Sequence, residues 1–287
     1  MPNELMKSKR TVFPVLVFAL VTQGYANQAI ALNQESAVVK APTEVPATVA
    51  PQAFKPAPPP APIVEQYALD RLKQMSEKLA ATQAFTYRSS SSIEMSAVTG
   101  QFLTFFIDSE VALQRPNKLR VDLSGDLSTV QLYFDGANVS TFDPKNNLYA
   151  DVHSLATIDD VLDFVINKAR INFPSGDFLY SNPYAVMSKD LTHAIIVGPS
   201  MVNGVPCDHF AYMNPSINWE VWVAKGANAL PMRLAMTYKK APNFPRFLIE
   251  FSDWNLNPSL NADTFVFKVP ANAKQIEFGH YEPEQKK

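Results

Sequence analysis

The hydrophobic pattern changes its period along the chain. Leu69, Leu72, Met75 and Leu79 are spaced three or four residues apart, with charged residues between them, which predicts an amphipathic helix. From Phe85 onward apolar and polar residues alternate, and a period of two is typical of β-strands. The pattern therefore predicts one helix followed by a series of strands.

The strand pattern is clearest at 102–113, where Leu103, Phe105 and Ile107 share one face of a long predicted strand. Further alternating runs lie at 119–123, 205–213, 217–223, 232–238 and 247–251. Runs of this length, repeated in succession, indicate a sheet built from many sequential strands.

One segment between the strands returns to the helical period. Thr157 is followed three residues later by Asp160, a spacing typical of a capping box with Asp in place of Glu. The apolar residues of the predicted helix then recur at helical spacing: Ile158, Val161, Leu162, Val165, Ile166 and Ala169. This second helix has a wide apolar face to bury.

Two dipeptides mark expected hairpins, because Asp135-Gly136 and Asn203-Gly204 both tolerate positive φ angles. Many sequential strands with only two or three helices predict an α+β fold, in which a strongly curved antiparallel β half-barrel has its concave face covered by helices. Such a fold encloses an apolar groove. We expect seven residues to line it: Leu103, Phe105, Ile107, Val161, Leu162, Val165 and Trp219.

Two predicted strands carry large apolar residues on both faces, FLTFFI at 102–107 and WEVWV at 219–223. A sheet with one face in water shows a cleaner alternation. Either both faces of the sheet are covered, or helices pack on the concave face and the convex face carries incidental aromatic residues. The large apolar side chains of these two strands are expected either to pack in a core or to line a lipid cavity.

The amino-terminal region predicts export. Lys7, Lys9 and Arg10 precede an apolar stretch at 11–21, which at about 16 Å is too short to span a bilayer as a helix. We expect residues 1–26 to be a signal peptide that is cleaved. The only cysteine lies far downstream, so the mature protein is not expected to be a lipoprotein. These features predict a periplasmic protein.

Residues 27–62 are expected to form a flexible spacer. The stretch 41–62 holds eight prolines in 22 residues, and such a composition favours extended polyproline II. This spacer is either a tail without a specific role or a tether that docks on an envelope partner. We place a single folded domain at 63–279 and a short tail at 280–287.

Composition and charge exclude several classes of function. The 287 residues carry a net charge of −2. The sequence has no run of basic residues beyond the first ten positions, so nucleic acid is not an expected partner. Removing residues 1–26 takes away three of the 25 basic and one of the 27 acidic side chains. The net charge then becomes −4, which gives no overall attraction to anionic membranes.

Catalytic motifs are equally scarce. Cys207 and His209 lie two apart on a predicted strand and face the same way, but neither lies on a turn suited to a nucleophile. The four histidines show no metal-binding spacing, and the sequence has no Gly-rich phosphate loop. We therefore expect a non-enzymatic protein with no catalytic residues, no metal and no cofactor.

The segment RPNKLRVDLSGDLSTVQLYFDGANVSTFDPKNNLYA at 115–150 resembles the LolA lipoprotein-carrier family. It places Arg115-Pro116-Asn117, Asp135-Gly136 and Phe142-Asp143-Pro144 in the order found in that family. FVFKVPANAKQI at 265–276 looks like the family's closing strand.

Two further segments, NGVPCDHFAY at 203–212 and WEVWVAKGANALPMRLAMTY at 219–238, are similar to an uncharacterised exported bacterial family of the LolA/LolB-like superfamily. The resemblance covers roughly residues 66–279. It implies a half-barrel with an apolar cavity for acyl chains. It also implies that Arg115 acts as a latch that controls release of the cargo.

Two functions remain open at this stage. One is a periplasmic carrier of lipid or lipoprotein acyl chains. The other is a non-enzymatic envelope interaction or structural protein, whose cavity is filled by its own side chains and whose Pro-rich spacer recruits a partner. A hollow interior favours the first, and a packed interior favours the second.

Overall fold

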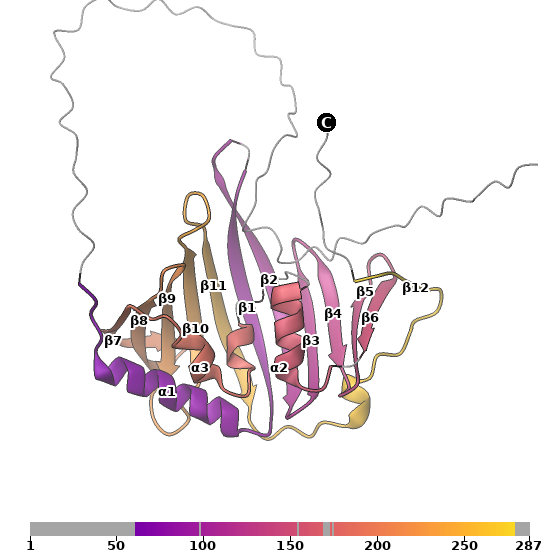
Figure 1. Cartoon of the computed structure of the whole chain (residues 1–287), viewed down its shortest axis with the longest axis horizontal. Helices are drawn as coiled ribbons and strands as arrows, with labels where there is room; N and C mark the ends of the chain where they lie inside the picture. The colour runs from indigo at the N-terminus through magenta and orange to yellow at the C-terminus, as the bar shows by residue number, and fades with distance from the viewer. Residues whose placement is uncertain (1–60, 98, 154, 169–172, 174, 279–287) are drawn as a thin grey trace, which may run out of the picture.

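The computed structural model describes residues 61–97, 99–153, 155–168, 173 and 175–278. These residues form one open, curved sheet of twelve strands in the order β12-β6-β5-β4-β3-β2-β1-β11-β10-β9-β8-β7 (Figure 1). The strands are β1 (Ala84–Ser96), β2 (Phe102–Gln114), β3 (Lys118–Gly125), β4 (Thr129–Phe134), β5 (Asn138–Asp143), β6 (Leu148–His153), β7 (His193–Val202), β8 (Val205–Met213), β9 (Ile217–Ala224), β10 (Pro231–Tyr238), β11 (Arg246–Asn255) and β12 (Lys274–Gln275).

The sheet is antiparallel apart from the parallel pair β12 and β6. Both predicted hairpins are present. Asn203 and Gly204 join β7 to β8 with φ angles of 48° and 80°, and Gly136 lies between β4 and β5 with a φ of 98°. These are left-handed conformations that Asn and Gly adopt most readily, so the turn residues account for the register of both hairpins.

Few helical segments interrupt the strands. They are α1 (Gln66–Ala81), α2 (Ile158–Asp163), the π-helix η2 (Phe164–Lys168), the 3-10 helices η3 (Gly176–Phe178) and η4 (Ala262–Phe265), and α3 (Pro183–Met187). The capping box predicted at Thr157 and Asp160 is present. The α-helix that it starts is short, because η2 takes over at Phe164. The predicted last helical residue, Ala169, lies outside the described residues.

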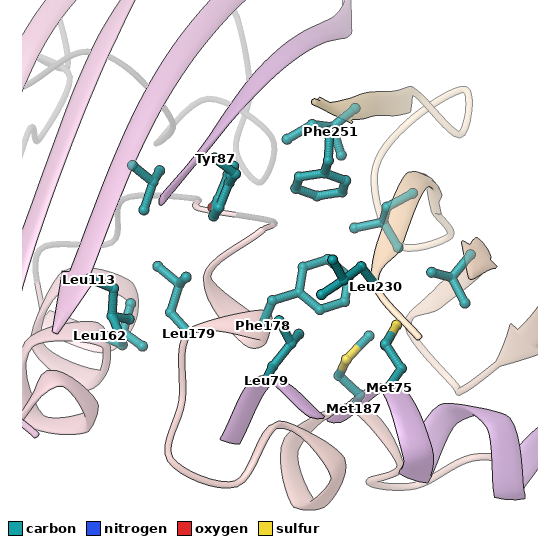
Figure 2. Packing of buried hydrophobic residues seen from close by; sticks show 14 of the residues in the cluster. Met75, Leu79, Tyr87, Leu113, Leu162, Phe178, Leu179, Met187, Leu230 and Phe251 are labelled. Atoms are coloured by element: carbon teal, nitrogen blue, oxygen red, sulfur yellow. The ribbon is translucent and has the colours of Figure 1, made fainter. Parts of the chain in front are cut away.

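The main core lies between the helices and one face of the sheet, which we call the helical face. α1 buries Leu72, Met75 and Leu79 there, while α2 buries Val161 and Leu162. Figure 2 shows these helices meeting strand residues such as Leu113 and Phe251 from distant parts of the sequence. The expectation that helices pack on the sheet is met, and their placement on its concave side stays a prediction.

The opposite, outer face of the sheet carries the carboxy-terminal segment. The segment expected to be a closing strand at 265–276 is largely irregular, and only β12 pairs, with β6. Phe267 explains this path, since its ring lies 5.5 to 5.6 Å from the rings of Tyr133, Phe142 and Tyr149. Aromatic packing across the strands therefore holds the segment in place, with no need for a backbone ladder.

The predicted amino-terminal segments lie almost entirely outside the described residues, as does the tail at 280–287. The boundaries of the four predicted regions therefore stay predictions. Among the residues that the structure describes, no helix has the length and apolar character needed to cross a membrane.

Candidate functional site

The interior between the helices and the helical face is closely filled. Phe178 and Leu179 of the η3 turn insert between α1 and the sheet, next to Met187 of α3 (Figure 2). All three side chains are buried. We call α1, α2, η3 and α3 together the helical cover, because their apolar residues close this part of the sheet.

The structure brings most of the predicted cavity residues together. Val161, Leu162, Val165 and Trp219 belong to the main core, and Phe105 packs against it. The other two residues lie apart. Ile107 is buried in a small cluster with Leu123 and Val130, and the side chain of Leu103 is 43% exposed.

Three hollows among the described residues have other walls. One has a volume of about 460 Å³, and half of its lining residues are charged, such as Arg88 and Asp122. Another of about 200 Å³ lies beside Tyr133 and Phe267, and the third has only about 10 Å³. None of the three is lined by any of the seven predicted cavity residues. Five of the predicted residues, Phe105, Val161, Leu162, Val165 and Trp219, instead pack in or against the main core.

Arg115 connects the sheet to the helical cover. Its guanidinium donates hydrogen bonds to the carbonyl oxygens of Leu179 (3.1 Å) and Tyr180 (3.0 Å), beside η3. A third, longer bond reaches the Leu79 carbonyl near the end of α1, at 3.4 Å. Because Pro116 restricts the backbone of Arg115 to extended conformations, the side chain is held at the end of β2. One arginine thus contacts two separate parts of the cover.

The surroundings of Arg115 are only partly polar. Burial lowers the pKa of its guanidinium, while the nearby Asp159 carboxylate opposes that shift. Asp159 itself accepts hydrogen bonds from the Ser181 backbone N–H and hydroxyl. The Tyr180 hydroxyl donates to Asp163 at 2.9 Å. These bonds link α2 to the turn that Arg115 holds, so the contacts form one connected polar edge of the cover.

Asp177 is the unusual residue of this edge. It lies in the middle of η3, between the buried Gly176 and Phe178, and no hydrogen bond to its side chain is found among the described residues. Burial raises the pKa of the Asp177 carboxyl to about 6. Partial removal from water, without a hydrogen-bond donor to replace it, disfavours the ionised form of a carboxyl group. The cover therefore contains a group that titrates just below neutral pH.

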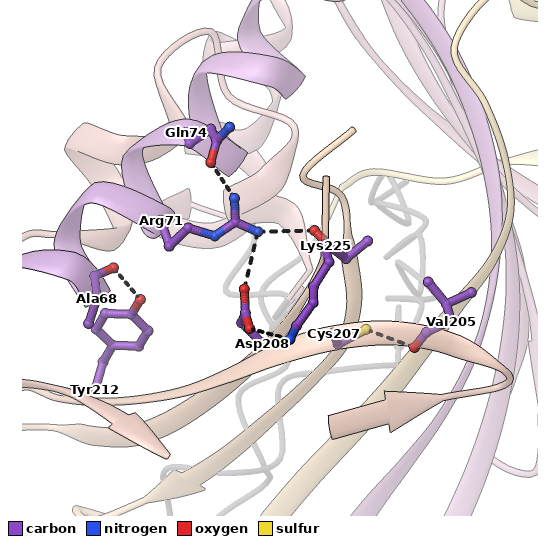
Figure 3. Close-up of polar contacts among 9 residues, drawn as sticks. Ala68, Arg71, Gln74, Val205, Cys207, Asp208, Tyr212 and Lys225 are labelled. Atoms are coloured by element: carbon purple, nitrogen blue, oxygen red, sulfur yellow. Dashed lines mark hydrogen bonds and ion pairs between the residues drawn. The ribbon is translucent and has the colours of Figure 1, made fainter. Parts of the chain in front are cut away.

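A second set of polar contacts anchors the first half of α1. The Arg71 guanidinium donates to the Ala224 carbonyl at 3.0 Å and to Gln74, and it lies 3.7 Å from the Asp208 carboxylate. Figure 3 shows this network, in which Lys225 also pairs with Asp208. Nearby, the Tyr212 hydroxyl donates to the Ala68 carbonyl at 2.8 Å. α1 is thus fixed to β8 and β9 at one end and to Arg115 at the other.

Beyond the helical cover the same sheet face turns polar for a short distance. Ser89 of β1 and Ser109 of β2 are paired across the strands with their hydroxyls 2.5 Å apart, and the Ser91 hydroxyl donates to the Ile107 carbonyl. Ser89 and Ser91 are both buried. The run of four serines at 89–92 could have indicated this polar patch from the sequence, because alternate residues of a strand face the same side and two of the four serines must therefore face the core.

Cys207 and His209 both lie on β8, as expected, yet each has its own partner. The Cys207 thiol is buried and donates to the Val205 carbonyl, and burial raises its pKa. The His209 ring stacks on Trp222 with centroids 3.9 Å apart and hydrogen-bonds Glu220. These contacts make each residue part of the packing of the outer face.

The sequence places the chain in a known family. Residues 68–279 match the family described as "Predicted periplasmic protein (DUF2092)", and the chain belongs to that family. This match confirms the expected membership of an exported bacterial family. No curated protein matches the sequence.

The chain is also similar to solved structures, among them a mycobacterial lipoprotein and a LolA superfamily protein. Lipoprotein LppX from Mycobacterium tuberculosis is 12% identical, with 69% of this chain and 100% of that chain covered, at a TM-score of 0.42. A LolA superfamily protein from Nitrosomonas europaea is 11% identical, with 70% of this chain and 97% of that chain covered, at a TM-score of 0.35.

Proposed function

We propose that the protein is a non-enzymatic periplasmic binding protein for the acyl chains of lipids or lipoproteins, with the helical cover closing over its binding face. The observation that carries the proposal is Arg115, which ties the helical cover to the end of β2 through three backbone carbonyls. In an aqueous compartment, burial of an acyl chain is favourable by about 0.8 kcal/mol of free energy for each methylene group removed from water. The burial of several methylene groups is sufficient to offset the loss of the Arg115 hydrogen bonds.

In this proposal the helical cover moves away from the sheet when a ligand enters. The concave face would then offer Phe105 and Trp219 from the sheet, and Val161, Leu162 and Val165 from the cover, as the apolar walls. Arg115 would act as the latch, because its hydrogen bonds form only when the cover is closed. The polar latch stabilises the empty state and so favours release of the cargo.

The test is the dissociation rate of a fluorescent fatty acid from the wild type and from Arg115→Leu. Loss of the latch and a gain of apolar surface both favour the loaded state, so we expect the variant to release the ligand about tenfold more slowly. Arg88→Leu is the matched control, because the side chain of Arg88 is exposed and, among the described residues, pairs with the equally exposed Glu110. Equal dissociation rates for the wild type and Arg115→Leu would remove Arg115 from the mechanism.

The binding site itself is tested separately. Phe105→Asp places an unpaired carboxylate against the acyl chain and should abolish fatty-acid binding, while circular dichroism checks that the variant is folded. A wild-type protein that binds no amphiphile at any concentration would overturn the carrier proposal.

The packed interior favours a second candidate. Since the seven predicted residues line none of the three hollows, the protein is alternatively an envelope interaction or structural protein that recruits a partner through its Pro-rich spacer. Deletion of residues 27–62 distinguishes the two functions. It should leave fatty-acid binding intact in a carrier and abolish partner capture in an interaction protein.

A further inference from the structure

Two neighbouring loops and the strand ends beside them present apolar side chains to solvent at the end of the sheet opposite α1. One is the turn between β1 and β2, and the other is the β10–β11 loop at 239–245 (Figure 1). Phe106 is 60% exposed and Phe244 is 59% exposed. Leu103 and Leu248 beside them are also exposed. We call these four residues the apolar tip.

The residues of the tip lie on adjoining strands. Phe106 of β2 and Leu248 of β11 are both paired with Ser92 of β1. The two side chains therefore belong to the same row across the outer face, about 10 Å apart at the usual strand spacing. Leu103 is paired with Met95 on the other face of the same hairpin. The tip thus combines both faces of one hairpin with the neighbouring strand.

The β10–β11 loop holds Phe244 outward by its own structure. Asn243 and Phe244 have φ angles of 62° and 54°, which is a rare conformation for a bulky residue and marks a candidate functional site. The loop is closed by backbone hydrogen bonds from Tyr238 to Pro245 and from Phe244 to Ala241. An ordered loop that exposes an aromatic ring loses little conformational entropy when that ring is buried by a partner.

The charges within the β10–β11 loop are basic, and at its end the Glu94 carboxylate of β1 accepts a hydrogen bond from the Arg246 backbone N–H. Lys239 and Lys240 open the loop, and Arg246 follows it. The ion pairs found among the described residues include neither lysine. Arg246 is more than half exposed while it contacts Glu220. An exposed aromatic ring with two lysines in the same loop suits the headgroup region of an anionic bilayer.

We propose that the apolar tip and the β10–β11 loop dock the protein on an anionic membrane surface. Phe244 and Phe106 enter the interface between headgroups and acyl chains, and Lys239 and Lys240 contact the lipid phosphates. The local basic loop provides an attraction that the overall net charge of the chain does not. The proposal goes beyond the carrier function and does not depend on it, because docking requires no movement of the helical cover.

The test is co-sedimentation of the mature protein with vesicles of phosphatidylcholine, with and without 30 mol% phosphatidylglycerol. We expect binding to the anionic vesicles that weakens as salt is raised. Phe244→Asn should lower the affinity at least tenfold, because Asn keeps the left-handed backbone but removes the ring. Met201→Asn is the matched control, since Met201 is equally exposed, at 59%, on the distant β7 edge.

The charges are tested by a double variant, Lys239→Glu with Lys240→Glu. It should weaken binding about fivefold or more for each lysine, whereas the same change at the exposed Lys145 and Lys274 should have little effect. A Phe244→Trp variant gives a direct readout, because its emission should shift to shorter wavelength when anionic vesicles are added.

Equal binding by Phe244→Asn and Met201→Asn would overturn the proposal. So would a wild-type protein that binds neither kind of vesicle, and that result would indicate a protein as the occupant of the tip. Failure of the fatty-acid assay together with retained vesicle binding would overturn only the carrier function.

Discussion

Two strand segments with the same kind of sequence have opposite environments in this protein. WEVWV at 219–223 in β9 is buried on both sides. Trp219, Val221 and Val223 belong to the main core, and Trp222 packs on the outer face with Cys207 and Met232. FLTFFI at 102–107 in β2 instead has two strongly exposed side chains, Leu103 and Phe106.

The neighbouring strands explain the difference. β9 is paired along its length with β8 and β10. The pairing of β2 with β3 stops at Ile107 and Gly125, so residues 102–106 are paired only with β1. On the side where β3 has ended, this part of β2 has no neighbouring strand among the described residues to shield its side chains. The apolar pattern of a strand therefore indicates burial only where flanking strands and covering helices extend far enough.

The largest effect is expected in the buried segment. Trp219 is 5% exposed and stacks on Tyr212, with ring centroids 4.1 Å apart. Trp219→Ala should lower the free energy of unfolding by about 3 to 5 kcal/mol, because it removes packed area and leaves a cavity. Urea denaturation measures this change. A loss below about 1 kcal/mol would mean that β9 is no better covered than the tip of β2.

The sequence predicted those features that depend on local chemistry. The Asn203-Gly204 hairpin followed from the φ angles that both residues adopt, and the first helix followed from the spacing of Leu72, Met75 and Leu79. The capping box at Thr157 was equally local. In each case a few neighbouring residues determine the structure by their own conformational preferences.

Features that depend on distant contacts could not be predicted. Nothing within 102–107 reveals that β3 ends at Gly125, so the exposure of Phe106 had no local signal. The path of the carboxy-terminal segment depends on Phe267 meeting rings from three strands. Of the candidate site, the position of Arg115 came from the family resemblance, whereas the burial of Asp177 depends on how η3 packs within the helical cover.

The pKa of the Asp177 carboxyl depends on how well the helical cover excludes water from the end of the sheet that it covers. The folded state raises the pKa of its carboxyl to about 6 from an ordinary value of 3.8, so the folded protein binds the proton more tightly than the unfolded chain does. The ionised group destabilises the fold above pH 6. The wild type should therefore become more stable as the pH falls from about 7 to about 4.

Asp177→Asn removes this titration and tests the sign. We expect the variant to be more stable than the wild type at pH 8, by about 1 to 2 kcal/mol, and equal to it near pH 4. Thermal unfolding at several pH values gives the comparison. Parallel stability curves for the two proteins would show that water reaches Asp177 and that the cover is looser than the packing of its neighbours indicates.

The smallest effect is expected at the exposed segment. Phe106 is 60% exposed, and the Asp126 carboxylate accepts a hydrogen bond from its backbone N–H, which does not involve the ring. Phe106→Ser should therefore change the free energy of unfolding by less than about 0.5 kcal/mol, although a change of the same kind at Trp219 costs several times more. If docking on anionic vesicles uses the apolar tip, Phe106→Ser should nevertheless weaken vesicle binding. Urea denaturation and vesicle co-sedimentation on the same protein sample separate the two effects. A clear loss of stability would mean that another part of the chain covers Phe106, and the contrast between the two strand segments would then no longer hold.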